Sequence, residues 1–511
     1  MKFDSTYRKY WTISLAAAAA AMILVISMTS RFGIGISPDS ACYISIAENV
    51  VAGNGYAIYD LQPAVAWPPL YPTALAVAGL FDIDYSLWAR ILNVLLAGGI
   101  VLLTSLWLLN NFGLSLLSLV GISGTMFSSA LLGVAKFAWT EPMFNLLVLS
   151  FLLVAIRAGQ KPERKDILLL SILAALATMT RYMGITLIGF YFLWLWLSGL
   201  PSKTKLKYSL IFGGLSLAPL VIWLIRNYAI TSTLSGHRAS SDVPVLKNIL
   251  YTLDTFSSWL FATDSYVELR IVIFSLLLVP FFIFLLKTIK NSALSDKIKI
   301  KLKAFGLFAL IYILYLIIAS SIVAFDRIDY RLLSPVYVPI LLFIIVAIDS
   351  INFSRRWPKQ AAAIYSVLWI VFLSVGLFKE VSAAISEGAG GYSTISWQDS
   401  GLAGYLKENP PEGKTYSNYP DGIYALSGLP ASMSPGKYSH NLPESKTGDF
   451  DLLTAKFEKQ ENVYLAWFTQ KSRRLLYDPD ELSSNFELIL IVKKSDGALY
   501  RISNKTAASD R

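Results

Sequence analysis

Long apolar stretches separated by short polar segments follow one another from near the start of the chain to about residue 377. A helix needs about 20 mostly apolar residues to cross a membrane, and eleven stretches approach that length. This pattern predicts a polytopic α-helical membrane protein with about 11 transmembrane helices. The predicted spans cover residues 12–30, 86–108, 113–134, 141–156, 166–180, 182–198, 207–225, 270–286, 304–324, 333–349 and 360–377.

The composition supports this fold class. Of the 511 residues, 55% are hydrophobic and only 15% are charged, whereas a soluble globular chain carries about 25% charged residues. An ordinary soluble enzyme is therefore excluded. The strands of an outer-membrane barrel alternate in segments of about ten residues, so the long apolar blocks exclude that architecture as well.

The formal net charge of +10 comes largely from lysine and arginine in short segments next to the predicted spans. This placement explains the charge without a nucleic-acid partner, because basic residues beside membrane helices face the cytoplasm and contact anionic membrane lipid. The basic segments fall on one side when the N-terminus is cytoplasmic. They cover residues 2–9, 157–165, 203–207, 287–303 and 355–359.

An odd number of spans then places the C-terminal domain outside the cytoplasm. No small-residue cleavage site follows the first apolar run, so it is predicted to remain as a membrane helix. The single cysteine, Cys42, excludes an intrachain disulfide. Together with the lack of targeting signals, this favours a multi-pass protein of a prokaryotic plasma (inner) membrane.

Two domains are predicted from this layout. Residues 1–377 form a transmembrane domain with long outer loops at 31–85 and 226–268, and residues 378–511 form a soluble extracytoplasmic domain. The second domain is polar, and its short apolar runs alternate with helical stretches, which predicts a small α/β fold. The clearest predicted strands and helices are Asp399–Glu408, Tyr416–Asp421, Gly448–Lys459, Val463–Phe468 and Leu488–Val492.

The first outer loop carries the most informative pattern. A helix is predicted over residues 39–52, because Pro38-Asp39 is a helix-start signal and apolar residues recur on one face, as in an amphipathic helix on the outer membrane surface. Asp39 falls in its first turn, where the helix dipole favours a carboxylate. From the residues alone, Asp39 is either a helix-start residue or a functional acid.

The motifs Asp-Ser-x-x-Tyr-x-x-x-Ala-x-Asn, Gly-x-Gly and Pro-Pro-Leu-Tyr-Pro occur in this loop in that order. With the predicted topology, they resemble the GT-C superfamily of membrane glycosyltransferases. The similarity is greatest to the branch that contains protein O-mannosyltransferases and the lipid A aminoarabinose transferase. Further matching segments, within residues 12–377, are Arg90–Asn93, Thr140–Phe144, Thr180–Gly184, Arg226–Tyr228 and Arg331–Pro335.

The resemblance implies an inverting transferase that moves a sugar from a polyprenyl-phosphate carrier to a glycan, lipid or protein acceptor on the non-cytoplasmic face. It also implies that Asp39 is the catalytic base and that Glu141 is a second acid in the site. Many mannosyltransferase relatives carry a second acid directly after the first, whereas this chain has Ser40 there. With serine at position 40, the chain lacks the second carboxylate that could bind a metal together with Asp39.

No cofactor is predicted with certainty. One cysteine and two histidines do not supply the ligands of a usual zinc site. A divalent cation held by Asp39 and Glu141 stays open as an alternative, and no metal ligand is assigned.

Cationic side chains near the outer boundary are candidates for the leaving phosphate, since guanidinium groups bind phosphate oxygens in pairs. Each also has a structural alternative, such as an ion pair with a neighbour, outward snorkelling or simple solvation. Lys136, for example, could contact phosphate or neutralise Glu141. The predicted substrate-binding residues are Tyr43, Arg90, Lys136, Arg181, Arg226, His237, Arg238 and Arg331.

Two competing functions remain at this point. A transporter or flippase of lipid-linked sugars would bury ionisable residues near the bilayer midplane and contain internal repeats. In this chain the ionisable residues gather near one membrane face and no repeat is found. A non-catalytic scaffold whose outer domain binds a partner would not depend on Asp39.

Overall fold

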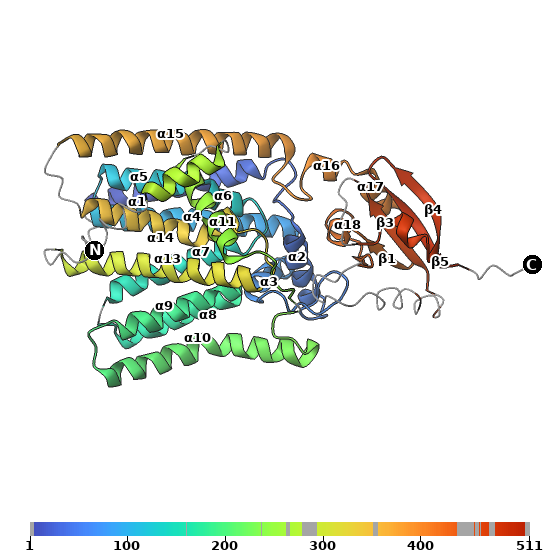
Figure 1. Ribbon diagram of the computed structural model, residues 1–511, viewed down its shortest axis with the longest axis horizontal. Helices are drawn as coiled ribbons and strands as arrows, with labels where there is room; N and C mark the ends of the chain where they lie inside the picture. The colour runs from blue at the N-terminus through green and yellow to red at the C-terminus, as the bar shows by residue number, and fades with distance from the viewer. Residues whose placement is uncertain are drawn as a thin grey trace, which may run out of the picture.

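A computed structural model describes most of the chain. Figure 1 shows a bundle of long helices at one end and a small α/β domain at the other, with the short helices of the first outer loop between them. The described residues are 5–436, 454, 459, 461–469 and 476–505, except 160, 237, 262–265, 278–293 and 351–355.

The predicted polytopic helical fold is confirmed. Eight helices among the described residues are long and apolar enough to cross a membrane. They are α1 (Ser5–Met28), α4 (Tyr85–Phe112), the pair α5 (Leu116–Met126) and α6 (Ser129–Ala135), α7 (Glu141–Ala158), α10 (Ser202–Thr231), α13 (Asp296–Ile322), α14 (Tyr330–Asp349) and α15 (Arg356–Glu387).

Two shorter helices pack within the same bundle, α8 (Arg164–Thr180) against α10 and α9 (Ile185–Trp196) against α13. They correspond to the predicted spans 166–180 and 182–198. The predicted span 270–286 lies partly outside the described residues, and its described part, 270–277, is helical.

The helices approach closely where small residues meet. The alanine-rich α1 packs along α4, and a Cβ added at Gly98 of α4 would overlap the side chain of Met22 of α1. Small residues allow close backbone approach, which is how helices associate in a membrane.

The loop between α1 and α4, which the sequence predicts to be the first outer loop, forms α2 (Pro38–Val51), α3 (Leu70–Ala76) and a short 3₁₀ helix, Val77–Leu80. The predicted helix 39–52 is therefore confirmed, but its environment differs from the prediction. Every residue from 40 to 47 is buried, because α2 packs against α3 and α4 on one side and against the C-terminal domain on the other. It is an internal helix and does not expose one face.

The predicted second outer loop, residues 226–268, contains a helix that the sequence analysis did not predict. This helix, α11 (Val245–Leu260), lies against α13 and α14.

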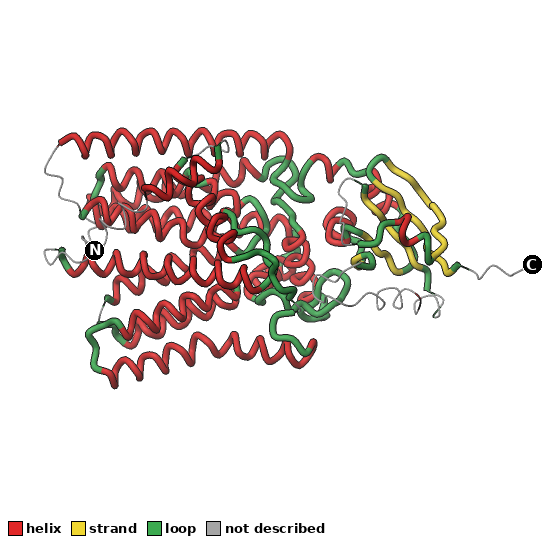
Figure 2. Tube along the Cα trace, viewed as in Figure 1, coloured by secondary structure: helices red, strands yellow, loops and turns green. Residues whose placement is uncertain are grey.

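The C-terminal domain contains a five-stranded sheet of order β2-β1-β3-β5-β4 (Figure 2). β1 pairs in parallel with β2 and β3, whereas β5 pairs antiparallel with β3 and β4. The strands are β1 (Lys414–Ser417), β2 (Ser432–Met433), β3 (Val463–Phe468), β4 (Phe486–Lys494) and β5 (Gly497–Asn504), and the helices are α16 (Ile395–Gln398), α17 (Gly401–Glu408), α18 (Pro420–Ser427) and α20 (Pro479–Leu482).

This arrangement confirms the predicted α/β fold. The predicted strands at 463–468 and 488–492 correspond to β3 and β4, and 416–421 runs from β1 into α18. The predicted helix Gly448–Lys459 lies almost entirely outside the described residues.

Candidate functional site

Two carboxylates from distant parts of the chain meet at the end of the bundle that faces the C-terminal domain (Figure 1). Arg331, in the first turn of α14, joins them: its Nη2 lies 2.6 Å from Asp39 Oδ2 and its Nε lies 2.7 Å from Glu141 Oε1. Asp39 and Glu141 each lie in the first turn of a helix, where the dipole favours an anion. Arg331 lies in the first turn of α14, where the helix dipole disfavours a cation. Its ion pairs with Asp39 and Glu141 offset this unfavourable interaction.

A second arginine completes the cluster. Arg181, between α8 and the following 3₁₀ turn, donates from Nη1 to Glu141 Oε1 at 2.5 Å and to Thr140 Oγ1 at 2.8 Å. The Glu141 side chain is 0% exposed, those of Arg331 and Arg181 are 14% and 15% exposed, and that of Asp39 is 32% exposed. Glu141 is thus the buried centre of the cluster, and Asp39 is its accessible acid.

The other oxygen of Asp39 also has a partner. Trp67 donates from Nε1 to Asp39 Oδ1 at 3.3 Å. Ser37 caps α2 by accepting from the backbone N–H of Ser40. Since Ser37 and not Asp39 provides the cap, the Asp39 carboxylate is not needed to start the helix.

Trp139 is a site residue that the sequence analysis missed. The guanidinium of Arg331 lies 4.1 Å from the centre of the Trp139 ring, and Trp139 Nε1 donates to Ser37 Oγ at 2.7 Å. Trp139 directly precedes Thr140-Glu141 in the sequence, and this proximity to a predicted site acid could have indicated a site residue. Aromatic residues are common at membrane interfaces, so that signal alone was weak.

Two of the predicted substrate-binding residues donate hydrogen bonds to backbone carbonyls of one loop. Arg226 donates to the carbonyls of Tyr56 and Ala64 at 3.3 and 3.2 Å, and Arg238 donates to the carbonyl of Ala66 at 3.0 Å. These contacts fix the segment that ends at Trp67, the residue that contacts Asp39.

Arg90 and Lys136 also have structural partners. Arg90 donates to Thr29 Oγ1 at 2.8 Å and to the carbonyl of Ile26, which ties α4 to α1. Lys136 forms a 3.0 Å ion pair with Glu380 of α15 and does not pair with Glu141 among the described contacts.

Tyr43 is buried one turn after Asp39. It packs edge-to-face against Trp67 and Tyr71, with ring centres 6.1 and 5.4 Å away. His237 lies outside the described residues.

The described residues contain no group of three side chains of the metal-ligating types histidine, cysteine, aspartate and glutamate. Asp39 and Glu141 are bridged by a guanidinium in this structure. The arrangement therefore offers a divalent cation two carboxylates at most, and only by displacing Arg331.

A large cavity opens deeper in the bundle. It has a volume of about 1130 Å³ and is lined almost entirely by apolar residues of α9, α11, α13 and α14, with Trp369 of α15. Representative lining residues are Phe256 and Trp259 of α11 and Tyr337 of α14. Tyr337 lies less than two turns along α14 from Arg331.

The face of α2 that is turned away from the bundle contacts the C-terminal domain. Tyr424 of α18 donates a hydrogen bond to Glu48, and its ring stacks on Tyr59 with centres 5.3 Å apart. Burial raises the pKa of Glu48 from its ordinary value of 4.5, although the Tyr424 hydrogen bond opposes the shift. The protonated carboxyl is therefore favoured more in the folded than in the unfolded protein.

This shift predicts a pH-dependent stability. A raised folded-state pKa means that the contribution of Glu48 is fully present below pH 4.5 and is lost as the pH rises through the folded-state value. Glu48→Gln should unfold at the same temperature as wild type near pH 4.5 and at a higher temperature near pH 8. Thermal unfolding of both proteins across this range measures the difference, and a constant offset would contradict the prediction.

Comparison with solved structures finds the same fold in membrane glycosyltransferases. ArnT from Cupriavidus metallidurans, in the apo state and bound to undecaprenyl phosphate, aligns with a TM-score of 0.63 at 13% and 14% identity, over 96% of this chain and 97% and 98% of ArnT. Arabinofuranosyltransferase AftD from Mycobacteria aligns with a TM-score of 0.54 at 13% identity, over 97% of this chain and 40% of AftD.

The archaeal oligosaccharyltransferase AglB from Archaeoglobus fulgidus, in complex with an inhibitory peptide and a dolichol-phosphate, aligns with a TM-score of 0.50 at 12% identity, over 90% of this chain and 70% of AglB. Neither a protein-family model nor a curated protein sequence matches the chain. At these identities the similarity concerns the fold, and at that level the predicted GT-C resemblance is confirmed.

Proposed function

We propose that this protein is an inverting glycosyltransferase that moves a sugar from a polyprenyl-phosphate carrier to an acceptor hydroxyl on the non-cytoplasmic face of the membrane. The observation that carries the proposal is the ion cluster of Asp39, Glu141, Arg181 and Arg331 at the mouth of a fold shared with ArnT. Such a cluster combines an accessible acid with two guanidinium groups, which is what displacement of a lipid phosphate requires.

Asp39 is the proposed general base. Its side chain is the most exposed of the four, and a positioned carboxylate that accepts the proton of an attacking hydroxyl speeds such a step by about 10²–10⁴-fold. The hydroxyl oxygen attacks the anomeric carbon, the bond from that carbon to the phosphate oxygen breaks, and the proton passes to Asp39. One direct displacement inverts the anomeric configuration.

Arg331 and Arg181 are the proposed phosphate contacts. Guanidinium groups shielded from water stabilise the charge that develops on the leaving phosphate. Arg331 is paired with Asp39 in this structure, so a donor phosphate that takes over part of Arg331 would leave Asp39 Oδ2 free to accept a proton. The buried Glu141 carboxylate positions both arginines through its ion pairs with them.

The apolar cavity is the proposed site of the prenyl chain. Its lining suits an isoprenoid, and the part lined by Tyr337 lies close along α14 to the proposed phosphate contact Arg331. Burial of prenyl methylene and methyl groups contributes affinity in proportion to the apolar area covered. ArnT, which shares this fold, has been solved bound to undecaprenyl phosphate, and this supports a polyprenyl-phosphate donor for the present chain.

The experiment uses the purified protein in lipid nanodiscs with a panel of polyprenyl-monophosphate sugars. We expect binding of undecaprenyl phosphate and, with one donor of the panel, release of polyprenyl phosphate when an acceptor is present. In proteoliposomes, movement of an intact lipid-linked sugar across the bilayer without release of phosphate would overturn the proposal in favour of a transporter. Failure to bind any polyprenyl phosphate would overturn it as well.

A further inference from the structure

We propose that Phe137 and Trp139 are positioning residues that couple the C-terminal domain to the ion cluster. The inference rests on the proposed function, because it gives Arg331 and Asp39 their roles in transfer. Neither aromatic side chain has a polar group that contacts the acids directly, so both act through other residues.

Trp139 contacts Arg331 and also the residue that caps the helix carrying Asp39. Its ring supports the guanidinium of Arg331 at 4.1 Å, and its Nε1 donates to Ser37, the cap of the helix that carries Asp39. A cation over an indole face in a site shielded from water is attracted to the ring. Movement of Trp139 would therefore displace Arg331 and the start of α2 together.

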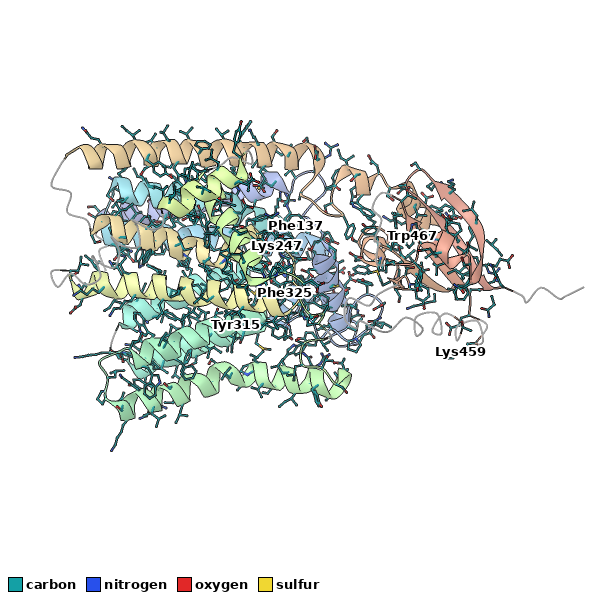
Figure 3. The ribbon with its side chains drawn as sticks, in the orientation of Figure 1. Phe137, Lys247, Tyr315, Phe325, Lys459 and Trp467 are labelled. Carbon is teal, nitrogen blue, oxygen red and sulfur yellow. The ribbon has the colours of Figure 1, made fainter. Side chains whose placement is uncertain are left out.

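Phe137 fixes Trp139. The two rings stack with centres 4.2 Å apart and planes 9° from parallel. Figure 3 shows Phe137 at the end of the bundle that faces the C-terminal domain. A Cβ added at Gly35 would lie 2.7 Å from the Phe137 ring, and one added at Gly390 would lie closer still. The Phe137 ring thus packs against two glycines, Gly35 in the segment before α2 and Gly390 in the segment after α15.

These two glycines lie on paired segments. The segment 34–37, which precedes α2, forms a parallel bridge from Gly35 to Phe137 and another from Ile36 to Gly391. Gly390 and Gly391 belong to the linker that joins α15 to the C-terminal domain. The backbone N–H of Tyr392 donates to the carbonyl of Ile36 at 2.7 Å.

The linker is therefore packed side by side with the segment that leads into Asp39. A shift of the C-terminal domain would move Gly390 against Phe137 and Gly391 against Ile36, where an added Cβ already has no room. Displacing reacting groups by about 1 Å can cost about 100-fold in rate. This gives the C-terminal domain a role in transfer that does not require it to touch the donor.

The test adds one methyl group and then makes room for it. Gly35→Ala should lower kcat about 10- to 100-fold, because its Cβ would lie 2.7 Å from the Phe137 ring, with the Lys136 carbonyl oxygen 3.1 Å away as a second and milder close contact, while Gly35 does not have a positive φ. Gly35→Ala combined with Phe137→Leu should recover to within about 3-fold of Phe137→Leu alone. Gly189→Ala, where nothing lies within 4 Å of an added Cβ, is the matched control and should resemble wild type.

Hydrogen–deuterium exchange over residues 34–41 is measured on wild type and these four variants without substrate. We expect faster exchange in Gly35→Ala and its reversal in the double variant. If Gly35→Ala matches Gly189→Ala in kcat and in exchange, or if Phe137→Leu gives no recovery, the coupling is overturned. If wild type has no transferase activity, the proposed function fails, and the exchange data still decide whether Phe137 couples these segments.

Discussion

Asp39→Asn should slow sugar transfer strongly while leaving donor binding intact. Asparagine has the same shape, and its one carbonyl oxygen can still accept a hydrogen bond from Arg331. Its NH2 group then replaces the oxygen that accepts from Trp67, so that 3.3 Å hydrogen bond is lost, and asparagine cannot accept the proton of the attacking hydroxyl. A general base contributes about 10²–10⁴-fold, so transfer should fall by at least about 100-fold. Ser37 caps α2, and the variant should therefore fold.

The measurement is release of polyprenyl phosphate at saturating donor, together with the Kd for polyprenyl phosphate. Asp82→Asn is the matched control: Asp82 is an exposed acid of the same outer loop, and its positive φ of 54° is a conformation that asparagine tolerates. Equal activity of Asp39→Asn and Asp82→Asn would show that Asp39 is not the base. Loss of donor binding in Asp39→Asn would show that Asp39 contributes to binding of the donor and not only to the chemical step.

The fold class and the helix that carries Asp39 could be predicted because both depend on local sequence. Apolar stretches report membrane helices, and Pro38-Asp39 reports a helix start. The pairing of Asp39 with Arg331 could not be predicted from the residues, since 292 positions separate them and packing alone brings them together.

The cationic residues show the same limit. Each lies near a predicted membrane boundary, where phosphate binding, snorkelling and carbonyl contacts favour the same residue type. Sequence could not separate Arg331, which contacts both acids, from Arg226, which holds the loop before Trp67. The burial of α2 was equally hidden, because it depends on how the C-terminal domain packs against it.

Glu141→Ala should destabilise the folded protein more than any other single change in the cluster. The Glu141 carboxylate is 0% exposed and accepts hydrogen bonds from both Arg181 and Arg331. Its removal leaves Arg181 without its only ion-pair partner in the described structure and places two largely buried guanidinium groups next to each other. Breaking a buried pair in this way costs about 3–5 kcal/mol.

Glu380→Ala is the matched control, since Glu380 pairs with Lys136 at the same end of the bundle but is 25% exposed. Because Glu380 keeps some contact with solvent and pairs with Lys136 alone among the described ion pairs, its loss should cost less than the loss of Glu141. The midpoints of denaturant unfolding in detergent measure both variants. If the midpoints agree, the two arginines are neutralised without Glu141, and the cluster is then a set of separate contacts. If Glu141→Ala alone unfolds at a lower denaturant concentration, Glu141 is the residue that allows Arg181 and Arg331 to lie side by side, as the proposed phosphate contacts require.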